Sequence, residues 1–145
     1  MNDPALIIAF NMARLDEDEK LARQLSKGGN PAIGVAGRWN AYREGGDDGW
    51  AIEDDAARKP APGIIGNRTV AAHIARHDPA RVLRQVAAGR RILARHHDDG
   101  HGYCAGCPNG EISGDPEWEI DECPENRDLA ATWADNPGYQ QRWAL

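Results

Sequence analysis

The sequence contains no apolar run long enough to cross a membrane. A transmembrane helix needs about 20 consecutive apolar residues, and the longest apolar stretch near the start of the chain is only Ala5–Phe10. No basic segment precedes this stretch and no cleavage site follows it, so it does not look like an export signal. We therefore expect a soluble, cytoplasmic protein.

Large apolar side chains are also scarce. The 145 residues include one Phe and two Met, and Ile, Leu and Val are few beside Ala, Gly, Asp and Arg. This length is typical of one domain, so we expect a single domain over residues 1–145. Its core should be thin, and the five Trp should supply much of the buried area.

The motifs of common enzyme sites are missing. There is no nucleophile elbow, no phosphate-binding glycine loop and no dinucleotide-binding fingerprint. The acidic residues offer no pair that we can place at one site. These absences favour a protein that is not an enzyme.

What is present begins with an acidic helix. Residues 3–27 carry apolar side chains at a 3.6-residue period, and Asp3 can cap this helix. The run Gly28–Pro31 should end it.

Residues 32–67 are predicted to form a hairpin and loops. Two short strand-like runs lie at 38–43 and 50–53, and Lys59–Gly63 is predicted to be a linker. A two-stranded hairpin is not stable alone, so the tryptophan in each run should pack on the helices.

Residues 68–97 are predicted to form arginine-rich helices. A short helix over 68–77 is followed by a long one over 79–97, which Asp78 can cap. Gly89 costs the long helix about 1 kcal/mol relative to Ala, and a close helix crossing there would explain it.

The remaining segments are a loop over 98–123 and a C-terminal helix over 124–145. A loop of this length is unusual in a compact domain unless something orders it. We predict a mainly α fold with a small β-hairpin, a single helical domain that a zinc ion staples.

The zinc prediction rests on the chain's three cysteines. Cys104 and Cys107 form a C-x2-C pair, and Cys123 precedes a predicted helix, whose dipole favours a thiolate. Three cysteines cannot all form internal disulfides, so in a reducing cytosol they are ligands or free thiols. Three thiolates and one imidazole are a common closed set for structural zinc.

Several alternatives stay open for these cysteines. They could be free thiols in a flexible loop, although zinc also explains how the loop is ordered. An iron–sulfur cluster lacks its fourth thiolate, and a redox C-x2-C lacks the strand-to-helix context of such sites. By spacing alone the fourth zinc ligand could be His96, His97 or His101.

A second histidine pair, His73 and His77, shares one face of a predicted helix. Two histidines at this spacing can bind a metal, which would allow a metal-dependent hydrolase. The metalloprotease signature needs Glu after the first His, and Ile74 occupies that position. We rather expect these imidazoles to pack against tryptophan or to bond to the acidic helix.

The charge is unevenly distributed. The net charge is −6, but segment 68–97 has seven arginines and one acid, so it carries +6 and the rest carries −12. This asymmetry could attract nucleic acid to the helix over 79–97. We favour internal neutralisation, in which part of the arginines pair with Asp16–Glu19 and the others face a protein partner.

The run His73–Arg84 resembles a domain-of-unknown-function family of small proteins from actinobacteria and their phages. Further similar features are an acidic first helix, the Cys pair, Cys123-Pro124 and the segment Ala134–Tyr139 followed by Trp143. The resemblance implies His96 as the fourth ligand. It implies no activity.

Together these observations predict a small, zinc-stabilised, non-enzymatic interaction or regulatory protein that binds a cellular or host protein. Nucleic-acid binding through the helix over 79–97 is the alternative. A metal-dependent hydrolase at His73 and His77 is the second alternative.

Overall fold

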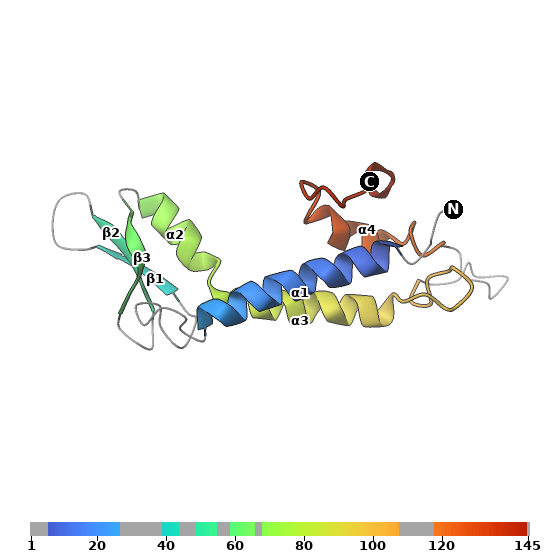
Figure 1. The fold of residues 1–145 in the computed structure, drawn as a ribbon, viewed down its shortest axis with the longest axis horizontal. Coiled ribbons are helices and arrows are strands. Elements are labelled where there is room, and N and C mark those ends of the chain that lie inside the picture. Colours follow the sequence, from blue (N-terminus) through green and yellow to red (C-terminus); the bar gives the residue numbers. More distant parts are fainter. Residues whose placement is uncertain are drawn as a thin grey trace. The chain divides into compact units, whose positions relative to one another are not determined.

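The computed structural model describes residues 6–26, 39–43, 49–54, 59–65, 68–107 and 118–144. In chain order the elements are α1 (Leu6–Ser26), β1 (Trp39–Arg43), β2 (Trp50–Asp54), β3 (Lys59–Ile65), α2 (Arg68–Arg76), α3 (Pro79–Arg95), α4 (Pro124–Ala131) and the 3-10 turn η1 (Gln141–Trp143) (Figure 1). The predicted mainly α fold with a small hairpin is confirmed. Among the described residues, no helix combines the length and apolarity needed to span a bilayer.

The chain forms two compact units. The first unit consists of Met1–Asp16 and Ala87–Leu145, and the second of Glu17–Val86. A single domain over residues 1–145 stays a prediction. The predicted helix cap at Asp3 and helix stop at Gly28–Pro31 lie outside the described residues.

The sheet belongs to the second unit and has three strands in the order β1-β2-β3, all antiparallel. The predicted hairpin is confirmed, with Trp39 opposite Asp54 and Arg43 opposite Trp50. The predicted linker Lys59–Gly63 is wrong, because it forms most of β3. Its two prolines favour a linker, but β3 is an edge strand, where a missing N–H on the outer side is tolerated.

Helix α2 packs on this sheet, as Figure 1 shows. Ala71 and Ala75 of α2 are buried, and so is Ile52 of β2. The Arg68 guanidinium lies 5.5 Å from the centre of the Trp50 ring, which is the range of a cation–π contact. The expected packing on a helix is therefore confirmed for Trp50, and for the Trp39 side chain it stays a prediction.

The link between α2 and α3 is held by Asp78. One carboxylate oxygen accepts the N–H of Arg81 at 2.6 Å, and the other accepts the N–H of Trp39 at 3.4 Å. The predicted cap of α3 is confirmed, and the same side chain also ties the start of β1 to the helix.

The first unit is built on an aromatic cluster. Trp143 is 1% exposed and packs with Ile7 and Ala130. The Phe10 ring lies 5.2 Å from the Trp143 ring and 6.2 Å from the Tyr139 ring. One phenylalanine therefore joins the start of α1 to the C-terminal turn.

Gly89 lies where α3 meets α1 within the first unit. A Cβ atom at this position would be 2.8 Å from Leu15 Cδ2 and 3.5 Å from Leu129 Cδ1. Real Cβ contacts are longer than the first of these distances. The predicted close crossing is confirmed. Glycine lowers the helix propensity of α3 at this position, but it lets α3 and α1 pack closely.

Candidate metal centre

Four donor atoms meet in the first unit: His96 Nδ1 and the Sγ atoms of Cys104, Cys107 and Cys123. All four lie within 4.8 Å of one another. His96 Nδ1 is 3.5 Å from Cys104 Sγ and 3.7 Å from the other two sulfurs. Cys123 Sγ is 3.5 Å from Cys104 Sγ and 3.6 Å from Cys107 Sγ. These residues could hold a metal ion.

The spacing of the donors matches a tetrahedral ion. Two thiolates bound at about 2.3 Å in a tetrahedron are about 3.8 Å apart, and a thiolate and an imidazole nitrogen are about 3.6 Å apart. The five distances between 3.5 and 3.7 Å agree with these values to a few tenths of an ångström. The three thiols are not disulfide-bonded.

The loop between His96 and Cys104 is shaped by two aspartates. Asp98 accepts the N–H groups of Gly100 and Gly102 at 2.7 and 3.1 Å. Asp99 accepts the N–H groups of His101 and Tyr103 at 2.8 and 3.2 Å. These local bonds fold the loop back, so that Cys104 returns to the end of α3.

Gly106 lets the C-x2-C pair approach α3. A Cβ atom there would collide with the carbonyl oxygen of Arg95 and would lie 3.0 Å from His96 Nδ1. The small residue between the cysteines is thus a steric requirement. It allows both sulfurs to reach the imidazole at the helix end.

Cys123 is the N-cap residue of α4. Burial raises the pKa of its thiol to about 11, although the nearby backbone N–H of Asn126 acts in the opposite direction. Burial also raises the pKa of Cys107, and the neighbouring thiols add to this. Without a cation, both sulfurs are therefore protonated at neutral pH.

Two buried asparagines anchor the centre, and the sequence analysis missed them. Asn126 donates from Nδ2 to the carbonyl oxygen of His96 at 3.0 Å, and Asn11 donates to the carbonyl oxygen of Asn126 at 3.0 Å. Both side chains are 0% exposed. They tie α1, α4 and the end of α3 together behind the ligands. Asn11 could have been noticed in the sequence, because it is a polar residue on the apolar side of the first helix.

Glu125 is a fifth polar group at the centre that the sequence analysis did not assign. Its Oε2 atom lies 3.5 Å from Cys123 Sγ and 3.7 Å from Cys107 Sγ. A hydrogen bond from its own backbone N–H at the start of α4 lowers the pKa of this carboxyl group. Its position two residues after Cys123, in the first helical turn, could have indicated it.

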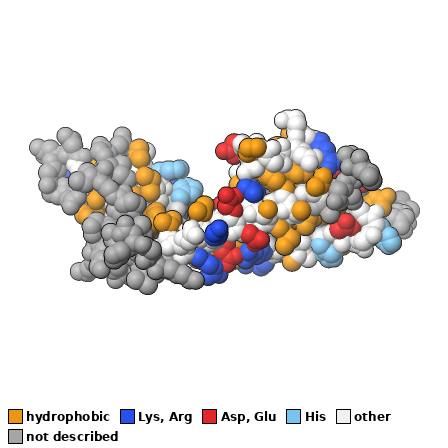
Figure 2. Space-filling model, viewed as in Figure 1, with side chains coloured by type: hydrophobic (Ala, Val, Ile, Leu, Met, Phe, Trp, Pro, Cys, Tyr) orange, Lys and Arg blue, Asp and Glu red, His pale blue; other side chains and the backbone are white. Residues whose placement is uncertain are grey.

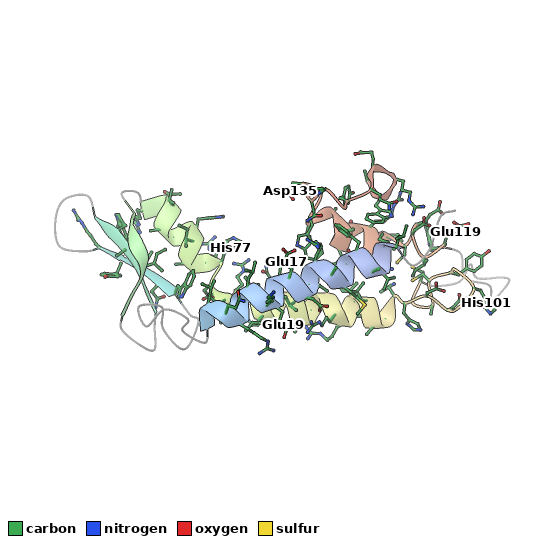
Figure 3. The ribbon with its side chains drawn as sticks, viewed as in Figure 1. Glu17, Glu19, His77, His101, Glu119 and Asp135 are labelled. Carbon is green, nitrogen blue, oxygen red and sulfur yellow. The ribbon has the colours of Figure 1, made fainter. Side chains whose placement is uncertain are left out.

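The other predicted ligands lie elsewhere. His101 is exposed on the loop after α3 (Figure 3), and the exposed His97 ring lies 3.2 Å from the Ala94 carbonyl oxygen. Of the three histidines, only His96 joins the cysteines. Residues 108–117, part of the predicted zinc loop, lie outside the described residues.

His73 and His77 do not form a comparable centre. Both are exposed, and their ring centres are 4.6 Å apart. They pack on each other, and the expected packing against tryptophan or bonding to the acidic helix stays a prediction. His77 and Asp18 line a hollow of about 160 Å³ with apolar walls. Within the described ranges, His96 and the three cysteines form the only group of three or more such donors.

Comparison with known protein families identifies the family of this chain. Residues 5–145 match the family model described as a family of unknown function, DUF6221. The chain belongs to this family. A search of the curated proteins gave no match, and a search of the solved structures gave none either. The predicted membership in a family of unknown function is therefore confirmed, and the DUF6221 model covers both compact units.

Proposed function

We propose that this DUF6221 protein is a zinc-stabilised, non-enzymatic interaction protein of the cytoplasm that binds another cellular protein. We also propose that it comes from an actinobacterium or from a phage of one, as the sequence resemblance implies. The observation that carries the proposal is the near-tetrahedral group of His96, Cys104, Cys107 and Cys123. Three thiolates and one imidazole favour zinc over hard cations such as magnesium and calcium.

The zinc ion would be structural. Four protein donors complete a tetrahedron, as in structural zinc sites, and leave no permanently open position for a substrate or a reactive water. Cys104 and Cys123 are 0% exposed and Cys107 is 6% exposed. The ion would clamp the end of α3, the loop and the start of α4 in one unit.

Zinc binding should release protons, because the metal binds thiolates and both Cys107 and Cys123 have raised pKa values. We expect at least two protons per zinc and an affinity that rises at least about 100-fold per pH unit between about pH 7 and pH 8.5. Calorimetry in buffers of different ionisation enthalpy counts the protons. Release near zero would mean that the thiols are already ionised in the metal-free protein.

The arginines of α3 support the interaction part of the proposal. Arg90 pairs with Asp16 at 2.7 Å, in line with the expectation that the acidic helix neutralises part of the arginines. Arg91 and Arg95 are exposed and make no ion pair within the described part of the chain. Exposed arginines are frequent anchors in protein interfaces, and these two lie four residues apart on one helix face.

Nucleic-acid binding through the same arginines is the second candidate. The exposure of these arginines favours nucleic-acid binding, but the charges around them do not. Over α1 and α3, the face seen in Figure 2 carries acidic and basic side chains interspersed. The net charge of −6 adds repulsion, whereas phosphate binding needs a basic surface. The protein partner therefore remains our first choice.

One set of measurements tests both candidates. Elemental analysis of protein purified without chelator should give about one zinc per chain. Labelled DNA and RNA should not bind at 150 mM salt. Cross-linking in a cell lysate should capture a partner whose binding falls at least about 30-fold when Arg91→Glu and Arg95→Glu are combined.

The opposite results are equally clear. A folded but metal-free protein would exclude the zinc site. Nucleic-acid affinity that falls steeply with salt, and that the double arginine variant abolishes with zinc retained, would establish the second candidate.

A further inference from the structure

The Glu125 carboxylate lies as close to three of the four donor atoms as two ligands of one metal ion lie to each other. Its Oε2 atom is 3.5 Å from Cys123 Sγ, 3.7 Å from Cys107 Sγ and 3.7 Å from His96 Nδ1. These distances equal those among the four donors themselves. Cys104 is the donor with which Glu125 makes no contact among the described atoms. The oxygen therefore covers the triangular face of the group opposite Cys104.

Glu125 is also the part of the centre that faces water. Its side chain is 47% exposed, whereas the His96 side chain is 12% exposed and the three cysteines are buried. Gly106 and the Arg95 carbonyl close the side near α3. A cation arriving from solvent meets this carboxylate before it meets a thiolate.

We propose that Glu125 is an exchangeable fifth ligand through which the metal ion is loaded and released. The inference rests on the proposed zinc site. Zinc can pass through five-coordinate states, and an oxygen on the open face can hold the ion while the sulfurs bind or leave one at a time. Permanent binding is disfavoured, because three thiolates already give the zinc centre a net charge of −1, to which a carboxylate would add another negative charge.

The test compares Glu125→Gln with Glu119→Gln in the full chain. Both variants remove one negative charge, but Glu119 is an exposed residue that makes no contact with the ligand atoms in the described part of the chain. Zinc transfer to a chromogenic chelator gives the release rate, and stopped-flow mixing with zinc gives the loading rate. Cobalt substitution reports the coordination number by visible absorption.

For Glu125→Gln we expect both rates to fall about tenfold while the dissociation constant changes less than about threefold. Glu119→Gln should match the wild type, and the cobalt spectra of all three proteins should be tetrahedral. Wild-type exchange rates in Glu125→Gln would overturn the proposal, as would a large loss of affinity, which marks a permanent ligand.

These failures differ from failure of the zinc site itself. If the wild type binds zinc and only the kinetic effect is missing, the proposed function stands without this inference. If the wild type binds no zinc, both are overturned.

Discussion

Replacing Cys123 with serine is expected to abolish metal binding and to destabilise the first unit severely. Cys123 contacts the other two sulfurs and the imidazole, and it is the N-cap residue of α4. Zinc binding to structural sites is worth about 10–16 kcal/mol at pH 7, as much as the whole stability of a typical domain. We expect a metal content below about one tenth of the wild type and a Tm lower by at least about 10 °C.

Elemental analysis and thermal unfolding followed by circular dichroism measure these effects. His101→Ala is the matched control, because His101 lies on the exposed loop and outside the donor group. This variant should keep about one zinc and a Tm within about 3 °C of the wild type. Metal loss in His101→Ala but not in His96→Ala would mean that the wrong imidazole is assigned. A Cys123→Ser variant with wild-type Tm and unchanged metal content would contradict the prediction that this centre stabilises the fold.

Replacing Gly89 with valine is expected to cost about 2–3 kcal/mol, because it forces bulk into a packed helix crossing. The first added carbon alone would lie 2.8 Å from Leu15 Cδ2, and the two methyl groups extend further towards buried side chains. Leu15 is 2% exposed, so it has little room to move. Denaturant unfolding should show a lower midpoint with a similar slope.

Ala87→Val is the control for this experiment. Ala87 is exposed on the same helix, so the valine there should cost less than about 1 kcal/mol, mainly in helix propensity. Both variants should retain zinc, which separates packing from metal loss. Equal destabilisation of the two variants would show that the crossing tolerates a side chain.

Local features of the chain were predictable from the sequence because they depend on near neighbours. Apolar residues at a 3.6-residue period indicated α1 and α3, and Asp78 indicated the cap of α3, because a capping carboxylate bonds only a few residues along the chain. Gly89 indicated a close crossing, because a glycine inside a helix costs stability unless something needs the space.

The three cysteines were predictable as candidate metal ligands for a chemical reason. Cys104, Cys107 and Cys123 cannot all pair as internal disulfides, and a C-x2-C pair followed by a third cysteine is a spacing typical of metal sites. The sequence resemblance favoured His96 among the three nearby histidines. Spacing alone left them equivalent, because a flexible loop can bring any of them near the sulfurs.

Only the tertiary structure decided which atoms surround that centre. Asn11 is 115 residues from Asn126, and no local pattern predicts a bond over such a separation. Glu125 reaches the cysteine sulfurs because Cys123 is the N-cap of α4 and Glu125, the second residue of that helix, lies in its first turn. β3 contains prolines that locally favour a linker, and pairing with β2 makes it an edge strand. The sequence by itself therefore determined the helices and the cysteines as candidate metal donors, through short-range periodicity and chemistry. The selected imidazole, its buried anchors and the exposed carboxylate depend on long-range packing.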